Sequence, residues 1–237
     1  MGGNLCSCED AGTDHVVAVI SPETEKEEGR NGDRGGTYKG SWQGTKKHGE
    51  GTLELPDGSR YDGQFKDDKR EGSGLYTYPS GAVYSGEWRD DLQHGSGEEN
   101  WPDGSSFTGK FEKGEKHGEG CFVWANQCKY EGQLQQNAMH GIGTYTWKDG
   151  RWYTGEWRDN AMGPTGRMVW TDGREYVGSF QNGQKHGEGE LSWPDGRYYQ
   201  GQWADGKMHG IGIACNAEGT KRTSKWENGE FMAWLQA

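Results

Sequence analysis

The sequence predicts an all-β protein of about eight β-hairpins, each 23 residues long, that continue one antiparallel sheet. Three observations lead to this fold class. A pattern of aromatic residues and glycines returns every 23 residues without an insertion. Each half of the pattern alternates with the period of two that marks a β-strand. Turn signals separate the two halves, as they do in a hairpin.

The composition excludes an ordinary aliphatic core. Only 30% of the 237 residues are hydrophobic and the mean hydropathy is −1.13, yet the chain has 12 tryptophans, 11 tyrosines and 43 glycines. Disordered chains are poor in aromatic residues, and collagen needs glycine at every third position. The chain must therefore bury aromatic rings against glycine.

Each unit begins with an aromatic residue, followed two positions later by glycine and two positions after that by a large apolar residue. The first aromatic residues form the tyrosine column: Tyr38, Tyr61, Tyr84, Phe107, Tyr130, Tyr153, Tyr176 and Tyr199. Most units continue with His-Gly-x-Gly, and many close with Pro-Asp-Gly. A second aromatic residue stands just before the closing turn. These turn rings are Tyr78, Trp101, Trp124, Trp147, Trp170 and Trp193.

The spacing predicts two strands per unit. Tyr38, Gly40 and Trp42 share one face of the first strand, and residues 49, 51, 53 and 55 alternate in the same way in the second. Pairs such as Asn182-Gly183 are strong hairpin-turn signals. Glycine inside a strand is unfavourable unless another group approaches its backbone closely. We therefore expect the aromatic rings to lie over the glycines.

This unit resembles the MORN repeat, whose pattern is Tyr-x-Gly-x-Trp followed by Gly-x-Gly and a closing Asp-Gly. The resemblance implies an elongated, twisted, single-layer antiparallel sheet with an aromatic-lined groove. It also implies a scaffold that holds partners at membranes or cytoskeletal structures. The choline-binding cell-wall repeat is also rich in glycine, tryptophan and tyrosine, but it lacks this Gly-x-Gly spacing.

Several positions depart from the pattern. Pro164 stands in the sixth unit where His-Gly-x-Gly belongs and removes a backbone donor. Glu99 replaces the large apolar residue of other units, and Trp152 and Tyr198 place rings on the polar face. Two interpretations stay open: the middle units are bent or bound to a partner, or the repeat has drifted without functional consequence.

The sequence has no motif for catalysis, a cofactor or a metal, so we expect a non-enzymatic protein without a cofactor. Six of the seven histidines occupy one column: His48, His94, His117, His140, His186 and His209. Equivalent residues of neighbouring hairpins lie about 9–10 Å apart, too far to share a zinc ion whose ligands lie about 2 Å away. We expect these histidines to pack at the turn edge. The net charge of −11 disfavours nucleic acid as a partner.

The chain divides into three segments. Residues 1–36 carry eight acidic and three basic side chains, a net charge of −5, and are expected to be flexible and solvated. Within them residues 15–20, "HVVAVI", are expected to form a short edge strand or a docking segment. Residues 37–229 form the repeat array of eight full units and a partial ninth. Residues 230–237 are predicted to fold over the last hairpin as a cap.

We expect the aromatic groove to bind a protein partner, as an extended or a helical segment, because an uncovered aromatic stripe is a large apolar surface. The predicted contact residues are Trp88, Trp101, Trp124, Trp147, Trp152, Trp157, Trp170, Tyr130 and Tyr153. One alternative is a phospholipid-headgroup binding module, which the acidic body disfavours. Another is a structural element that self-associates in a cytoskeletal or ciliary assembly. The sequence does not decide whether the chain forms a homodimer.

The first residues, "MGGNLCSC", resemble an N-myristoylation site at Gly2, although Cys6 stands where the stricter pattern has Ser or Thr. One myristoyl chain gives only marginal membrane binding, so a second signal is needed. The neighbouring residues Glu9 and Asp10 are acidic, which leaves Cys6 and Cys8 as candidates for palmitoylation. We therefore expect a peripheral, lipid-anchored protein on the cytoplasmic face of a membrane.

Overall fold

The structure, a computed structural model, describes residues 35–236. These residues form two compact units, an N-terminal unit that ends at Asn137 and a C-terminal unit that begins at Ala138. Every regular element in residues 35–236 is a β-strand. The predictions for Gly2, Cys6, Cys8 and residues 15–20 lie outside the described residues.

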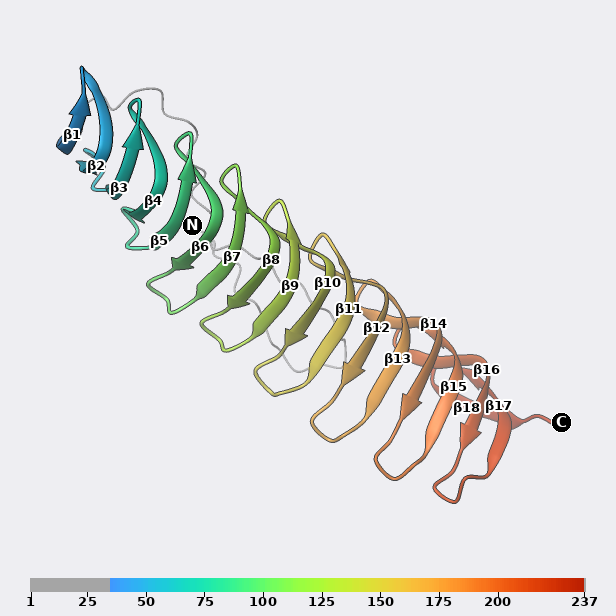
Figure 1. The fold of residues 1–237 in the computed structure, drawn as a ribbon. Helices are drawn as coiled ribbons and strands as arrows, with labels where there is room; N and C mark the ends of the chain where they lie inside the picture. The colour runs from blue at the N-terminus through green and yellow to red at the C-terminus, as the bar shows by residue number, and fades with distance from the viewer. Residues whose placement is uncertain (1–34, 237) are drawn as a thin grey trace. The chain divides into compact units, whose positions relative to one another are not determined.

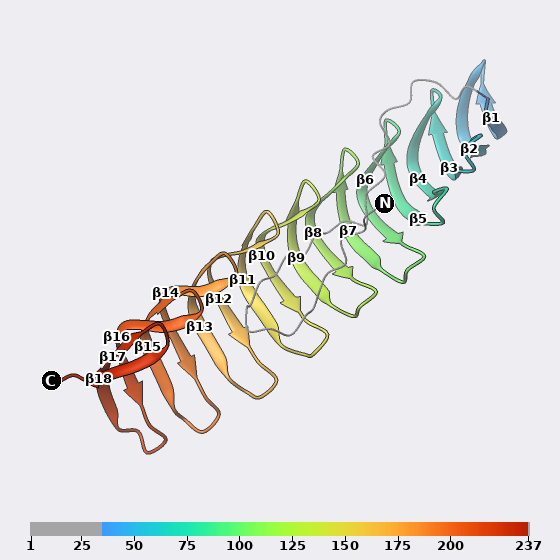
Figure 2. The ribbon, with the colours of Figure 1, turned by 180° about the vertical axis from the view of Figure 1, so that it is seen from behind.

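In both units each strand pairs in antiparallel fashion with the next strand along the chain, as Figures 1 and 2 show. The predicted all-β hairpin architecture is confirmed. The strands of the N-terminal unit are β1 (Thr37–Gln43), β2 (Lys46–Glu54), β3 (Arg60–Lys66), β4 (Lys69–Thr77), β5 (Val83–Arg89), β6 (Leu92–Asn100), β7 (Ser106–Glu112), β8 (Glu115–Val123) and β9 (Lys129–Gln135). Those of the C-terminal unit are β10 (Ala138–Thr146), β11 (Trp152–Arg158), β12 (Ala161–Val169), β13 (Glu175–Gln181), β14 (Gln184–Ser192), β15 (Tyr198–Ala204), β16 (Lys207–Cys215), β17 (Lys221–Glu227) and β18 (Glu230–Trp234).

The two-residue turns inside the hairpins have the backbone conformation that the turn pairs predicted. Asp67 and Asp68 both have positive φ angles, 52° and 75°, and Asn182 and Gly183 follow the same pattern at 52° and 74°. Two consecutive positive φ angles define the type I′ turn, whose twist matches that of the flanking strands. The second turn residue also links neighbouring hairpins, since Asp68 Oδ1 accepts a hydrogen bond of 2.8 Å from the backbone N–H of Lys47.

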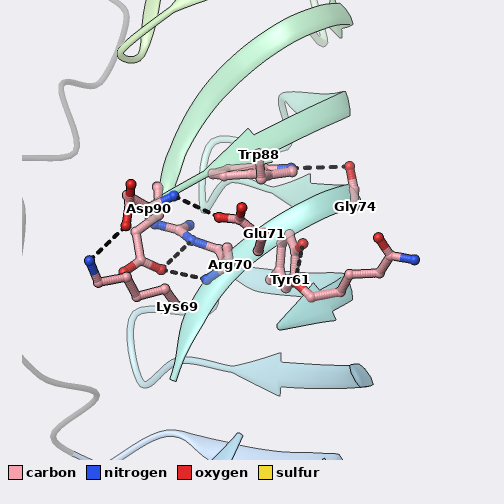
Figure 3. Close-up of polar contacts among 9 residues, drawn as sticks. Tyr61, Lys69, Arg70, Glu71, Gly74, Trp88 and Asp90 are labelled. Carbon is pink, nitrogen blue, oxygen red and sulfur yellow. Dashed lines mark hydrogen bonds and ion pairs between the residues drawn. The ribbon is translucent and has the colours of Figure 1, made fainter. Parts of the chain in front are cut away.

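The aromatic layer lies directly on the glycines, as expected. The ring of Tyr61 extends over Gly63 on its own strand and over Gly74 on the next strand. A Cβ atom added to Gly63 would lie 2.7 Å from the Tyr61 hydroxyl, and one added to Gly74 would overlap the ring. The Tyr61 hydroxyl donates to the carbonyl of Gln64 at 3.0 Å (Figure 3). The tyrosine therefore replaces the side chains that the glycines lack.

The apolar residue four positions after each tyrosine joins one hairpin to the next. Trp88 makes edge-to-face contacts with Tyr84 of its own hairpin, at 5.2 Å between ring centroids, and with Tyr61 of the preceding hairpin, at 5.3 Å. Its indole N–H donates to the carbonyl of Gly74 at 3.2 Å (Figure 3). Because aromatic pairs prefer this geometry, the rings form a continuous layer along each unit.

A further column on the aromatic face was missed by the sequence interpretation, because several of its members are charged. Its members are Lys47, Arg70, Gln93, Lys116, Met139, Met162, Lys185 and Met208. The Arg70 guanidinium lies 4.5 Å from the Trp88 ring (Figure 3). It also lies 5.1 Å from the Tyr76 ring, and its Nε is 3.4 Å from Asp91 Oδ1. Cations over aromatic rings are stabilised by the ring quadrupole. The sequence did contain a sign that this column faces the aromatic layer, because three of its members are the apolar residues Met139, Met162 and Met208.

Glu99, which departs from the repeat pattern, has a buried partner in this column. Its carboxylate accepts a hydrogen bond of 2.7 Å from Lys116 Nζ, and both side chains are almost completely buried. The ammonium also lies 5.1 Å from the Trp101 ring and 5.3 Å from the Phe107 ring. Burial lowers the pKa of Lys116, and the Glu99 carboxylate opposes that shift. The buried carboxylate of Glu99 and the buried ammonium of Lys116 therefore compensate each other.

Two regions depart from the regular repeat, namely the C-terminal residues 230–234 and the segment around Pro164. The predicted cap does not fold over the last hairpin, because residues 230–234 form β18 and pair with β17 to complete a ninth hairpin. Phe231 contacts the Trp226 ring at 5.6 Å, but its side chain stays exposed. Pro164 lies within β12, whose pairing with β13 begins only at Thr165. At the equivalent position of other hairpins Gly141 pairs with Trp157 and Gly187 with Trp203, so the ladder at Pro164 is one pair shorter, as expected for a residue without a backbone donor.

We predict that Glu99→Gln lowers the free energy of unfolding by about 3 kcal/mol or more, because it leaves the Lys116 ammonium buried without a counter-charge. The matched variant is Glu99→Leu with Lys116→Met, which copies the residue types at Leu53 and Met139 in other hairpins. Chemical denaturation of both variants makes the comparison. A double variant less stable than Glu99→Gln would contradict this account.

We also predict that stability falls above about pH 10, the unfolded pKa of tyrosine. Burial raises the pKa of Tyr199 to about 12 and raises the pKa of Tyr61, Tyr130 and Tyr153 as well. Since the folded state holds these protons more tightly, the stabilisation is complete below pH 10 and is lost as the pH rises through the folded values. Thermal unfolding from pH 8 to 12 with tyrosinate absorbance tests this. Ionisation of the whole tyrosine column near pH 10 without unfolding would refute it.

Candidate interaction surface

The structure buries most of the residues predicted to contact a partner. Six of the nine are buried: Trp88, Trp124, Trp147, Trp157, Tyr130 and Tyr153. Tyr130 and Tyr153 are completely inaccessible. The Tyr153 ring covers Gly155 and Gly166 and is covered in turn by the rings of Trp157 and Phe180. Such side chains support the sheet and offer no contact area. The described surface therefore leaves Trp101, Trp152 and Trp170 as the predicted residues with accessible rings.

Between the first and last hairpins, the accessible rings on the aromatic face include the turn rings. Tyr78 and Trp101 are half-buried in the N-terminal unit, and Trp170 and Trp193 are half-buried in the C-terminal unit. Each pair comes from neighbouring hairpins. Trp101 stacks on the buried Phe122 at 5.4 Å between centroids, which fixes the position of its half-buried indole.

In the C-terminal unit each turn ring is held by an arginine. The Arg174 guanidinium lies 5.5 Å from the Trp170 ring and 2.7 Å from Asp172, and Arg197 bears the same relation to Trp193 and Asp195, at 5.6 and 2.8 Å. The Pro-Asp-Gly type of turn thus supplies a carboxylate that positions the arginine against the ring. This arrangement orders the indole before any partner binds.

Trp152 lies on the opposite face of the sheet. It pairs with Val169 across β11 and β12, and the Arg167 guanidinium lies 5.2 Å from its ring. The same face carries the exposed side chains of Ile142 and Ile211. The nine predicted residues therefore do not form one surface, since Trp152 and Tyr153 point to opposite sides of one strand.

The histidine column lies at the hairpin-turn edge, as predicted. His140 Nδ1 is 3.6 Å from a carboxylate oxygen of Asp159, in the turn of the next hairpin, and the backbone N–H of Asn228 donates to His209 Nδ1 at 3.4 Å. Among residues 35–236 no three histidine, cysteine, aspartate or glutamate side chains gather closely enough to hold a metal ion. A helix that could span a membrane is likewise not found in this part of the chain.

Comparison with known proteins supports one family. The model of the MORN repeat matches residues 38–60, 61–83, 84–106, 107–129, 130–150, 153–173, 176–196 and 199–220. Comparison with curated protein sequences found no match.

Two solved structures show partial likeness to the fold. The TCP domain of Drosophila melanogaster SAS-4, in complex with a proline-rich motif of Ana2, has 12% identity and a TM-score of 0.43, covering 64% of this chain and 83% of that one. The TCP10 domain of Danio rerio CPAP, in complex with a STIL peptide, has 12% identity and a TM-score of 0.26, covering 85% and 100%.

The eight matched segments run through most of the chain in the register that the tyrosine column predicts. The chain therefore belongs to the MORN repeat family.

Proposed function

We propose that this chain is a non-catalytic scaffold, tethered to the cytoplasmic face of a membrane by N-terminal acyl chains, that binds a protein partner through its turn rings. MORN repeats are interaction scaffolds for proteins or membranes. The observation that carries the proposal is the set of accessible, pre-ordered rings at the start of the inter-hairpin turns, above an otherwise buried aromatic layer.

The turn rings are already held in place by neighbouring side chains before a partner binds. Trp101 is stacked on Phe122, and Trp170 is flanked by Arg174 and by Lys185, whose Nζ lies 5.1 Å from the ring. A side chain that is already ordered loses little entropy on binding, and tryptophan is enriched at binding hot spots. The turn rings can therefore contribute affinity that a mobile side chain could not.

The spacing of the rings favours an extended or helical partner segment. Equivalent positions of neighbouring hairpins are two strands apart, about 9–10 Å. A segment that follows the row of turns reaches both Tyr78 and Trp101, or both Trp170 and Trp193. Such a row suits a linear segment better than a compact small molecule, which binds in a concave pocket.

Replacing Trp170 with Ala should reduce partner capture while the protein stays folded. The experiment is affinity capture from the native cell, quantified by mass spectrometry, with Trp101→Ala as a second test variant. Ile142→Ala, on the opposite face, is the matched control. Proteins retained by the control and lost from at least one of the tryptophan variants are the expected result. Identical captured proteins for all variants, at equal stability, would overturn the proposed binding surface.

We predict that Gly2→Ala moves the protein from the membrane to the soluble fraction of its native cell, because the acceptor for myristate is lost. Cys6→Ser with Cys8→Ser should weaken membrane retention, since one acyl chain alone binds marginally. Fractionation followed by immunoblotting measures both effects. Full membrane retention of Gly2→Ala would show that a partner, and not the acyl chain, holds the protein there.

A further inference from the structure

The N-terminal edge of the sheet is incomplete. Among the described residues β1 pairs only with β2, so the other edge of β1 has no strand beside it (Figure 1). Trp42 on this strand is 55% exposed, whereas Phe65 and Trp88, at the same position of the next two hairpins, are 3% and 4% exposed. A free edge beside an exposed indole is an unprotected surface for strand addition.

Trp42 is more exposed than Phe65 because no described hairpin precedes its own. Phe65 is covered because Tyr38 of the preceding hairpin contacts its ring at 5.1 Å between centroids. Among the rings of residues 35–236, Trp42 contacts that of Tyr38 in its own hairpin, at 5.0 Å between centroids. Among the described residues, Trp42 therefore lacks the ring contact that Phe65 receives from the preceding hairpin.

The register between β2 and β3 shows what a strand on the free edge must provide. Leu53 lies opposite Tyr61, Gly51 opposite Gly63, and residue 49 opposite Phe65, in a ladder without a bulge. The preceding strand thus presents an apolar residue to the tyrosine, a glycine to the glycine, and a second glycine, Gly49, to the large ring. The three positions alternate with a period of two.

We propose that residues 15–20, "HVVAVI", add to β1 as an antiparallel strand with Ile20 opposite Tyr38, Ala18 opposite Gly40 and Val16 opposite Trp42. At the first two positions this register presents an apolar and a small residue, as β2 does to β3 with Leu53 and Gly51. At the third position Val16 stands where β2 has Gly49, and it adds an apolar side chain beside the exposed Trp42. Val17 and Val19 then lie on the opposite face.

Alanine is acceptable at the middle position for a specific reason. Gly51 must be glycine because the ring of Tyr38, from its own hairpin, covers it, and an added Cβ would overlap that ring. No tyrosine of the repeat precedes residues 15–20, so Ala18 faces no such ring. The Cβ of Ala18 instead adjoins Gly40, which has no side chain.

The chain between Ile20 and Tyr38 is long enough to let residues 15–20 lie beside β1. Leu53 and Tyr61 are eight positions apart in the sequence, and Ile20 and Tyr38 are eighteen apart. The extra residues include several glycines, and lengthening a flexible loop has a small entropic cost. The added strand would place residue 2 within fourteen residues of the sheet edge. The inference stands independently of the proposed membrane anchor and partner.

Hydrogen exchange of β1 in the full chain tests the proposal. In the wild type, the β1 amides that point away from β2 should be protected from exchange. Ala18→Asp places a charge on the packed face and should raise their exchange rate about tenfold or more. Val17→Asp, the matched control on the opposite face, should leave the rate unchanged. Equal rates in the wild type and Ala18→Asp, or an equal effect of both substitutions, would overturn the proposed register.

A disulfide trap separates the chain's own segment from a second copy. Val17→Cys with Ser41→Cys should cross-link under mild oxidation, because the register places both residues opposite each other on one face. Val16→Cys with Ser41→Cys places them on opposite faces and should not. Mixing unlabelled and ¹⁵N-labelled protein reveals, by mass spectrometry, which chains are joined. Cross-links within one chain support the proposal, and cross-links only between chains would refute it in favour of a dimer.

Discussion

The contact between a tyrosine ring and a pair of glycines is the constraint on which the rest of the structure depends. A single-layer sheet has no second layer to cover its apolar face, so the cover must come from the sheet's own side chains. The Tyr61 ring fills that role only because Gly63 and Gly74 leave their side-chain positions empty. Once the ring lies flat, Trp88 can contact two tyrosines edge-to-face and join consecutive hairpins. The same contact between a tyrosine ring and a glycine pair, repeated from hairpin to hairpin, thus builds the aromatic layer of each unit.

This constraint also decides which aromatic residues are available for function. A ring that covers the glycines is buried, and a buried ring offers no area to a partner. The residues outside the layer have a different character: the turn rings, the exposed apolar side chains of the opposite face, and Trp42 at the sheet edge. The aromatic residue and the glycines of the tyrosine layer recur in every full unit, while the turn rings and the residues at the sheet edge differ in their exposure.

Much of the fold could be predicted from the sequence, because the period of 23 and the alternation within each half specify the hairpins and their faces. The type I′ turns followed from pairs such as Asn182-Gly183. The burial of Trp88 and Tyr153 did not follow, because a pattern shows which residues share a face but not whether that face covers itself. The burial of Lys116 could not be predicted, because lysine is rarely buried in proteins. Glu99 does depart from the apolar residues at the same position of other units. A buried acidic residue of this kind is a reason to search for a buried basic residue nearby.

The most direct measurement of the central claim is a double-mutant cycle between Gly74 and Tyr61, followed by chemical denaturation. The φ angle of Gly74 lies outside the range that disfavours alanine, so the backbone alone tolerates the change. In the wild-type background Gly74→Ala should lower the free energy of unfolding by about 2 kcal/mol or more, because the added Cβ overlaps the Tyr61 ring. In a Tyr61→Val background the ring is absent and the same change should have an effect of less than about 1 kcal/mol. Equal losses in both backgrounds would show that the ring does not determine the glycine, and would contradict the account.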